Sequence, residues 1–128
     1  MSFRFGVLLV AVLSALPAAA EPPANLPYVA RAIVTTNIKD LEPVDNRSHF
    51  PEAVDRVNFF TDVRNMNGKT IAHRWEYQER VMLETRFNIS SDRYRVYSTK
   101  TMTKLWPGAW RAVVADSEGN TLAAVTFT

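Results

Sequence analysis

Hydrophobic and polar residues along this chain alternate in short runs. β-Branched and aromatic residues form stretches of about eight to eleven residues, and Asn, Gly, Asp and Pro cluster between the stretches. None of them has the apolar repeat of 3.6 residues that is typical of an amphipathic helix. We therefore predict little helix and seven strands. The predicted strands are Tyr28–Ile38, Arg56–Asn65, Lys69–Tyr77, Val81–Ile89, Arg93–Met102, Ala109–Asp116 and Thr121–Thr128.

Seven short strands at regular spacing favour an all-β, antiparallel sandwich like those of immunoglobulin and fibronectin type III modules. A partly closed barrel is the alternative. We expect residues 28–128 to form this single domain. Asn67-Gly68 predicts a hairpin between the second and third strands, and Gly119 predicts another between the last two. The connection Lys39–Asp55 contains two prolines and no strand pattern, which predicts a long loop.

The stretch His73–Tyr77, HRWEY, is dense in functional-looking side chains, but strand alternation divides it between two faces. Ile71, His73, Trp75 and Tyr77 share one face, which must meet the apolar face of the next strand. A three-residue loop, Gln78–Arg80, makes these faces coincide, whereas a two-residue loop sets Trp75 against Met82. We therefore predict the following pairs: Tyr77 with Val81, Trp75 with Leu83, His73 with Thr85, Ile71 with Phe87, and Arg74 with Glu84 on the outer face.

This alternation places His73 on an apolar face between Ile71 and Trp75. A histidine in that position is more often a core residue bonded to a hydroxyl or a carbonyl than a catalytic base. Thr85 is one available partner. The functional interpretation of His73 requires a position near the rim of the sandwich, where a ligand reaches the imidazole.

Aromatic and arginine side chains at alternate positions are the better candidates for ligand binding. Arg93, Arg95 and Tyr97 share one face of their strand, and Phe60 alternates with polar residues on another. Such rows suit stacking on sugar rings and capture of carboxylates or phosphates. The alternative is a solvated outer sheet face on which arginine stems cover the aromatic rings. Trp106 lies in a loop beside Pro107 and is the more exposed tryptophan by prediction, whereas Trp110 belongs to the core.

Evidence for an enzyme is weak in this sequence. Ser98 and Lys100 share a face, as a Ser–Lys dyad requires, but no nucleophile-elbow motif accompanies them. Asp45, His49 and Glu52 form a conceivable metal set whose spacing matches no known motif. We therefore predict no metal or cofactor. An enzyme remains the alternative, as a small hydrolase or metal-dependent enzyme centred on His73 or His49.

The N-terminus predicts export. Met1–Ala20 contains Arg4, then small and apolar residues from Gly6 to Leu16, then an alanine-rich exit, as in a secretory signal peptide. We expect cleavage near Ala20, a Pro-rich tether at residues 21–27, and a periplasmic or secreted location. The apolar run is too short to span a bilayer about 30 Å thick, so we expect no transmembrane segment in the mature chain.

Charge and cysteine content narrow the range of partners. The net charge of +2 falls to +1 once Arg4 is removed with the leader, which does not match the clustered basic excess of nucleic-acid-binding proteins. The chain has no cysteine, so disulfides and thiolate chemistry are excluded.

Four segments together resemble the bacterial envelope family known as domain of unknown function 2914. They are RAIVTTNI with the following EP (Arg31–Pro43), FFTDVRNMNGKTIAHRW (Phe59–Trp75), FNISSDRYRVYSTK (Phe87–Lys100) and GAWRAVVADSEGNTLA (Gly108–Ala123). The resemblance covers nearly the whole mature chain and implies an extracytoplasmic β-domain, without implying a reaction.

Together these features predict an exported, non-catalytic binding or adaptor module. We expect it to engage an envelope polysaccharide or an envelope protein. The candidate ligand-binding residues are Arg93, Arg95, Tyr97, Phe60, Trp106, Lys100 and His73. A weaker possibility is pairing through the edge of the C-terminal strand.

Overall fold

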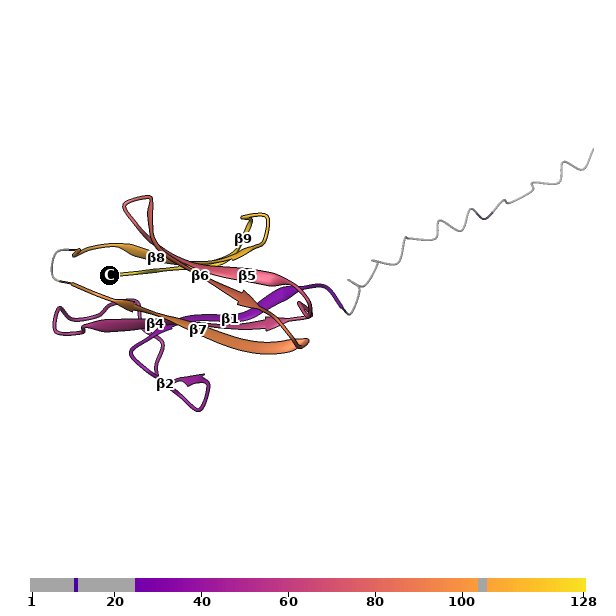
Figure 1. Ribbon diagram of the computed structural model, residues 1–128, viewed down its shortest axis with the longest axis horizontal. Helices are drawn as coiled ribbons and strands as arrows, with labels where there is room; N and C mark the ends of the chain where they lie inside the picture. The colour runs from indigo at the N-terminus through magenta and orange to yellow at the C-terminus, as the bar shows by residue number, and fades with distance from the viewer. Residues whose placement is uncertain (1–10, 12–24, 104–105) are drawn as a thin grey trace, which may run out of the picture.

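The computed structural model describes residue 11, residues 25–103 and residues 106–128, and all elements in these ranges are strands (Figure 1). The strands are β1 (Tyr28–Thr35), β2 (Ile38–Lys39), β3 (Glu42–Pro43), β4 (Arg56–Arg64), β5 (Thr70–Tyr77), β6 (Arg80–Asn88), β7 (Arg93–Thr101), β8 (Trp110–Asp116) and β9 (Thr121–Phe127). Almost all of the predicted signal peptide and most of the tether lie outside the described residues. The described part of the chain contains no helix long and apolar enough to cross a membrane.

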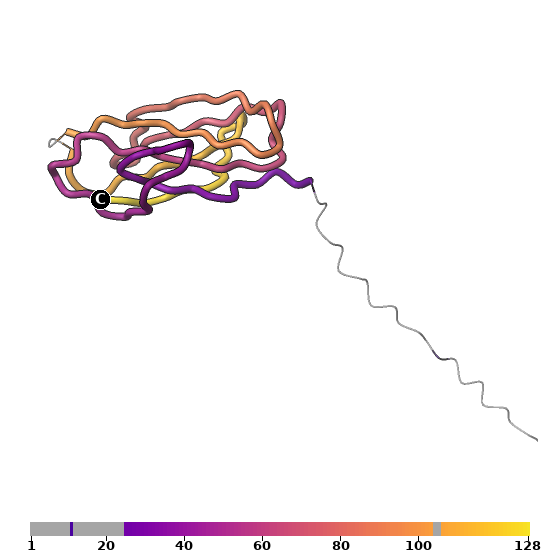
Figure 2. Tube along the Cα trace, turned by 90° about the horizontal axis from the view of Figure 1, so that it is seen from below, coloured from indigo at the N-terminus to yellow at the C-terminus, as the bar shows by residue number. Residues whose placement is uncertain are grey.

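Seven long strands form two antiparallel sheets that face each other, which confirms the all-β prediction (Figures 1 and 2). One sheet has the order β1-β4-β7 and the other the order β6-β5-β8-β9; we call them the three-stranded and the four-stranded sheet. The arrangement is an open sandwich and is compatible with an immunoglobulin-like domain. The short strands β2 and β3 pair with each other and lie outside the three-stranded sheet (Figure 1).

The predicted hairpin at Asn67-Gly68 is wrong, although the turn itself exists. Gly68 has the expected positive φ of 82°, but β4 pairs with β1 and β7 while β5 pairs with β6 and β8. The connection therefore carries the chain from one sheet to the other. Met66 is buried within this connection, and Gly68 donates its N–H to the carbonyl of Ile89. Turn residues specify a local reversal, but they do not specify which strands then pair.

The β5–β6 hairpin has the predicted register over most of its length and an unexpected turn. Ile71, His73, Arg74 and Trp75 lie opposite Phe87, Thr85, Glu84 and Leu83, as predicted. Tyr77, however, lies opposite Arg80, so the loop has two residues, Gln78 and Glu79, both with positive φ. A β-bulge at Met82 then adds one residue to β6 and restores the facing of the apolar sides.

Arg74 and Glu84 lie opposite each other on the outer face, as predicted, but their side chains do not form an ion pair. Arg74 Nη2 instead donates to the carbonyl of Gly119 at 3.4 Å, while Glu84 lies 4.0 Å from Arg86 on its own strand. Arg74 is half-buried, and its Nε has no hydrogen-bond partner among the described residues.

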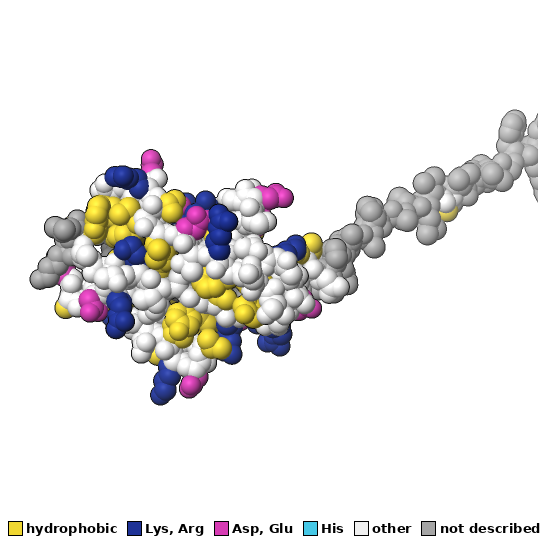
Figure 3. All heavy atoms as spheres, viewed as in Figure 1, with side chains coloured by type: hydrophobic (Ala, Val, Ile, Leu, Met, Phe, Trp, Pro, Cys, Tyr) yellow, Lys and Arg dark blue, Asp and Glu magenta, His cyan; other side chains and the backbone are white. Residues whose placement is uncertain are grey.

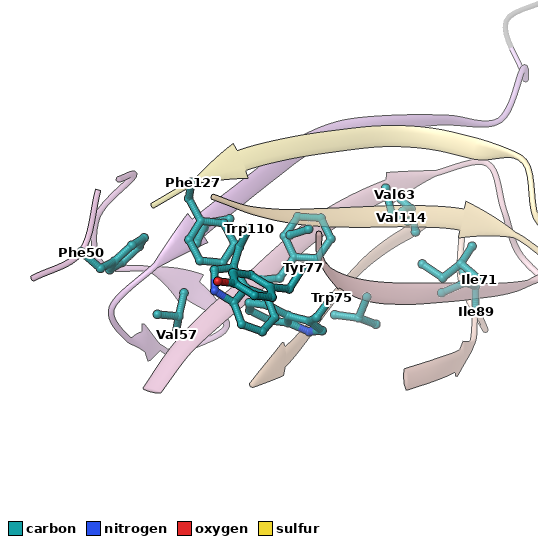
Figure 4. Packing of buried hydrophobic residues seen from close by; sticks show 14 of the residues in the cluster. Phe50, Val57, Val63, Ile71, Trp75, Tyr77, Ile89, Trp110, Val114 and Phe127 are labelled. Carbon is teal, nitrogen blue, oxygen red and sulfur yellow. The ribbon is translucent and has the colours of Figure 1, made fainter. Parts of the chain in front are cut away.

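The core between the sheets has an aromatic end and an aliphatic end (Figure 4). Trp75, Tyr77, Trp110 and Phe127 pack together at one end, with ring centroids 4.8 Å apart for Tyr77 and Trp110 and 6.0 Å apart for Trp75 and Phe127. Val63, Ile71, Ile89 and Val114 fill the other end (Figure 4). All but Tyr77, Trp110 and Phe127 are at most 2% exposed, so the inward faces predicted from alternation are confirmed.

A buried chain of hydrogen bonds links the two sheets through His73. The ring nitrogens of His73 on β5 lie 2.8 Å from Thr61 Oγ1 on β4 and 2.8 Å from Ser98 Oγ on β7. Trp75 Nε1 donates to the same Ser98 oxygen at 3.0 Å. His73 is fully buried and contacts the rings of Phe59 and Phe87. The prediction of a core histidine bonded to a hydroxyl is thus confirmed, with Thr61 and Ser98 in place of Thr85.

Burial lowers the pKa of His73 from 6.5 to about 3, because no charged partner compensates for the desolvation of an imidazolium. His73 therefore becomes protonated near pH 6.5 in the unfolded chain but only near pH 3 in the folded domain. The contribution of His73 to the free energy of unfolding is therefore fully present above pH 6.5. It should decrease as the pH falls from 6.5 toward 3, by at most about 1.4 kcal/mol per pH unit. Denaturant unfolding at pH 7, 6, 5 and 4.5 measures this loss.

The His73→Gln variant is the matched control, because glutamine offers a donor and an acceptor without titrating in this range. We expect it to be less stable than the wild type at pH 7 and to lose less stability between pH 6.5 and 4.5. An equal pH dependence in both proteins would contradict the account of His73.

The β5–β6 turn generates a second prediction. Gln78 and Glu79 have φ values of 48° and 64°, a conformation that Asn and Gly adopt at lower cost. The double variant Gln78→Asn/Glu79→Gly should raise the free energy of unfolding by about 1 kcal/mol. Urea unfolding tests this, with Glu118→Gly as a control that should bring no gain, since Gly119 already supplies the positive φ in that turn.

Candidate functional site

The outer face of the three-stranded sheet is covered by a small hairpin. Strands β2 and β3 are joined by Asp40 and Leu41, which have φ values of 52° and 57°. Lys39 and β3 fall within the segment Lys39–Asp55 that was predicted to be a loop without strands, so that prediction is wrong at its start. Ile38 was predicted to end the first strand, which instead ends at Thr35. Two residues per strand are too few to produce a readable alternation. The hairpin brings Glu42 over the sheet.

Beside this hairpin six charged residues line a cleft of about 400 Å³. We call it the arginine cleft; its residues are Arg31 on β1, Glu42 on β3, Asp62 and Arg64 on β4, and Arg93 and Arg95 on β7. Strand register explains the cluster, because Arg31, Asp62 and Arg95 lie in one cross-strand row and Arg64 and Arg93 form the next row on the same face. Of the sequence-predicted candidates, Arg93 and Arg95 meet here.

The carboxylates of Glu42 and Asp62 accept hydrogen bonds from three of the arginines. Glu42 receives two hydrogen bonds from Arg31, at 2.8 and 3.1 Å, and one from Arg95 at 2.6 Å. Asp62 receives two from Arg64, at 2.9 and 3.1 Å, and two from Arg31, at 3.2 and 3.4 Å. Arg31 therefore bridges both acids. These contacts hold the guanidinium groups in fixed positions, as recognition of a planar or tetrahedral anion requires.

The arginines depress the pKa values of both acids. Hydrogen bonds from Arg31 and then from Arg95 lower the pKa of Glu42 to about 2. Burial alone would raise the pKa of Asp62, but hydrogen bonds from Arg64 and Arg31 outweigh it and leave the pKa below its usual value. Both acids are thus ionised at neutral pH, and the cleft keeps a net charge of +2, from four arginines and two carboxylates.

Arg64 and Arg93 lie directly opposite each other on neighbouring strands. Like charges in that position destabilise a sheet by a few tenths of a kcal/mol or more. Asp62 satisfies Arg64, but no carboxylate within ion-pair distance accompanies Arg93 among the described residues. An anion between the two guanidinium groups would relieve their repulsion.

The aromatic candidates near the cleft differ in accessibility. Tyr97 follows Arg95 on the outward face of β7 and is 43% exposed, as predicted. Phe60 lies on the outward face of β4 but is only 1% exposed, so its interpretation as a ligand-stacking aromatic is corrected. The guanidinium carbon of Arg31 sits 4.9 Å from the centre of the Phe60 ring and shields it. This is the arrangement of the alternative interpretation, in which arginine stems cover the aromatic rings.

His73 is not in a position to bind a ligand in this structure. Its complete burial and its contacts with Thr61 and Ser98 place it in the core, and Ser98 is itself only 5% exposed. Ser98 and His73 therefore form a hydrogen-bonded pair that resembles part of a catalytic triad but that substrate cannot reach. This geometry gives the hydrolase alternative no support from His73.

The other candidates for chemistry are engaged separately. Both carboxylate oxygens of Asp45 accept hydrogen bonds from Thr35 or Thr36, and His49 Nδ1 lies 3.0 Å from Thr128 Oγ1. Among the described residues no three His, Asp or Glu side chains lie close enough together to hold a metal ion. The Asp45, His49 and Glu52 set is thus not assembled.

Trp106 and Lys100 lie far from the arginine cleft, at the opposite end of the β4–β7 ladder. Trp106 is 39% exposed and Trp110 is buried, as predicted. Lys100 Nζ lies 5.7 Å from the centre of the Trp110 ring and donates to the carbonyl of Thr101. The sequence candidates therefore divide between two places and do not form one site.

Sequence reasoning missed Arg31, Glu42, Asp62 and Arg64 as members of the site. Arg64 and Asp62 were placed on an outer face, but nothing local indicated that β4 pairs with β7 and so aligns them with Arg93 and Arg95. Glu42 carried no strand signal. The available clue was that several strands carry arginines at alternate positions. These arginines form a cluster only once the order of the strands in the sheet is known.

Comparison with known proteins agrees with the resemblance found in the sequence. No curated protein sequence matches this chain. The model of the family DUF2914, described as a protein of unknown function, matches residues 68–128, which contain β5 to β9. This match is narrower than the resemblance, which began at Arg31. It includes Arg93 and Arg95 but not the four other cleft residues. Residues 68–128, just under half of the chain, are therefore similar to the DUF2914 family of proteins of unknown function.

Proposed function

We propose that this protein is an exported, non-catalytic binding module of the bacterial cell envelope, and that its arginine cleft captures an anionic group of an envelope polymer. The observation that carries the proposal is the cleft itself. Four arginines converge on a volume of about 400 Å³ with two carboxylates to balance them. Guanidinium groups recognise carboxylates and phosphates through paired hydrogen bonds, which are stronger than neutral ones.

The neighbourhood of the cleft suits a saccharide polymer that carries such groups. Tyr97 is exposed two positions beyond Arg95 on the same strand face and offers a ring for stacking on a sugar. The face of the molecule seen in Figure 3 carries basic, acidic and hydrophobic side chains side by side. Glu42 and Asp62 work against binding of a weakly charged ligand, so the cleft selects for concentrated negative charge.

The test is capture of purified peptidoglycan sacculi and titration with pyrophosphate as a soluble anion. The Arg93→Ala/Arg95→Ala variant should sediment with sacculi at least tenfold less and bind pyrophosphate at least tenfold more weakly, because each lost charge-assisted contact contributes about 1.5 kcal/mol or more. Cosedimentation and isothermal titration calorimetry measure the two effects. Binding by the wild type should weaken as the salt concentration rises.

Arg86→Ala is the matched control, since Arg86 is an exposed arginine on β6 in the other sheet. It should bind like the wild type, and thermal melts should confirm that all variants fold. Equal capture by wild type, control and double variant would overturn the proposal. Binding of pyrophosphate without capture of sacculi would retain an anion site and reject peptidoglycan as its source.

A further inference from the structure

A second cavity lies at the aromatic end of the sandwich, away from the arginine cleft. It has a volume of about 300 Å³ and is bounded by residues from both sheets and from the loops next to them. Phe50, Val57, Trp110 and Phe127 form its inner walls and belong to the core, whereas Trp106 stands at its rim and is partly exposed. We call it the end pocket.

The rim of the end pocket is held in place. Trp110 Nε1 donates to the carbonyl of Trp106 at 3.0 Å, and the Tyr77 hydroxyl donates to the carbonyl of Pro107 at 2.6 Å. The Trp106 ring packs edge-on against Tyr77 at 5.5 Å. The opening is therefore bounded by an anchored indole. Preformed apolar pockets of about this size and larger are the usual form of small-ligand sites.

The apolar lining of the end pocket favours a hydrocarbon ligand. Aliphatic and aromatic carbon dominates the lining, and its few polar side chains, His49, Glu52, Thr103 and Thr128, leave most of the wall without hydrogen-bonding groups. A sugar placed inside would leave hydroxyl groups without partners, at a cost of about 1 to 3 kcal/mol for each. An alkyl chain instead gains from each methylene group that it buries.

A lysine marks the position for an anionic head group. Lys100 occupies an inward-facing position of β7, two residues after the buried Ser98, where an apolar residue would be expected. Lys100 is not itself a lining residue, but its ammonium group lies 5.7 Å from the centre of the ring of Trp110, which lines the pocket. The ammonium group donates one N–H to the carbonyl of Thr101. An ammonium has three N–H donors, so two are free to bind a carboxylate.

We propose that the end pocket binds a single medium-chain fatty acid, with its hydrocarbon chain among Trp106, Trp110 and Phe127 and its carboxylate on Lys100. Glu52 is the one acid in the lining, and it would repel a carboxylate placed beside it. The end pocket shares no residue with the arginine cleft. Binding of a fatty acid is therefore independent of the proposed capture of an envelope polymer.

Titration of the full-length folded domain with sodium decanoate tests the proposal. Two of the three tryptophans line the pocket, so their fluorescence should change saturably, and calorimetry should give one site per chain. Trp106→Ala should weaken decanoate binding at least tenfold. Lys100→Met keeps an unbranched side chain over Trp110 and should weaken binding of decanoate at least fivefold while leaving binding of decanol unchanged.

Leu122→Ala is the matched control, because Leu122 is an exposed apolar residue that lines a different cavity at the start of β9. It should bind decanoate like the wild type, and circular dichroism should show that each variant keeps its strands. No saturable response in the wild type would overturn the proposal, as would binding that neither Trp106→Ala nor Lys100→Met weakens. Equal losses for decanoate and decanol in Lys100→Met would overturn the role of the lysine.

Discussion

The two sheets are joined by buried hydrogen bonds between side chains of β4, β5 and β7, and the rest of the domain is arranged around them. Thr61, His73, Ser98 and Trp75 satisfy one another where water cannot reach. A protein without cysteine has no disulfide to fix the distance between its sheets, and apolar packing alone is tolerant of sliding. Hydrogen bonds that must be satisfied when buried impose one alignment, because a shift would leave polar groups without partners.

This alignment separates the side chains that hold the fold from those that are available to ligands. Alternation turns His73, Trp75 and Ser98 inward, and the same alternation on β4 and β7 turns Asp62, Arg64, Arg93 and Arg95 outward. The residues that look most catalytic in the sequence are therefore structural. The outward arginines come together because the strand order β1-β4-β7 places three sequence-distant strands side by side, and a hairpin of two short strands adds Glu42.

Alternation could be predicted because it is a local property, and it was right for the inner faces of β4, β5 and β7 and for the register of Ile71 to Trp75. Strand pairing is not local, so the turn at Asn67-Gly68 was interpreted as a hairpin when it connects two sheets. The two-residue turn at Gln78-Glu79 was rejected because a bulge at Met82 leaves no mark in the sequence. Phe60 was expected on an exposed face, and only the position of Arg31 on the neighbouring strand shows why it is buried.

His73 is a neutral, fully buried residue of the core. Long-range ¹⁵N NMR of the imidazole ring tests this most directly. If Trp75 donates to Ser98, Ser98 to Nδ1, and Nε2–H to Thr61, the ring holds one neutral tautomer. We expect the His73 ring to keep that tautomer unchanged from pH 8 to pH 5. A ring that titrates near pH 6.5 in the folded protein would contradict it.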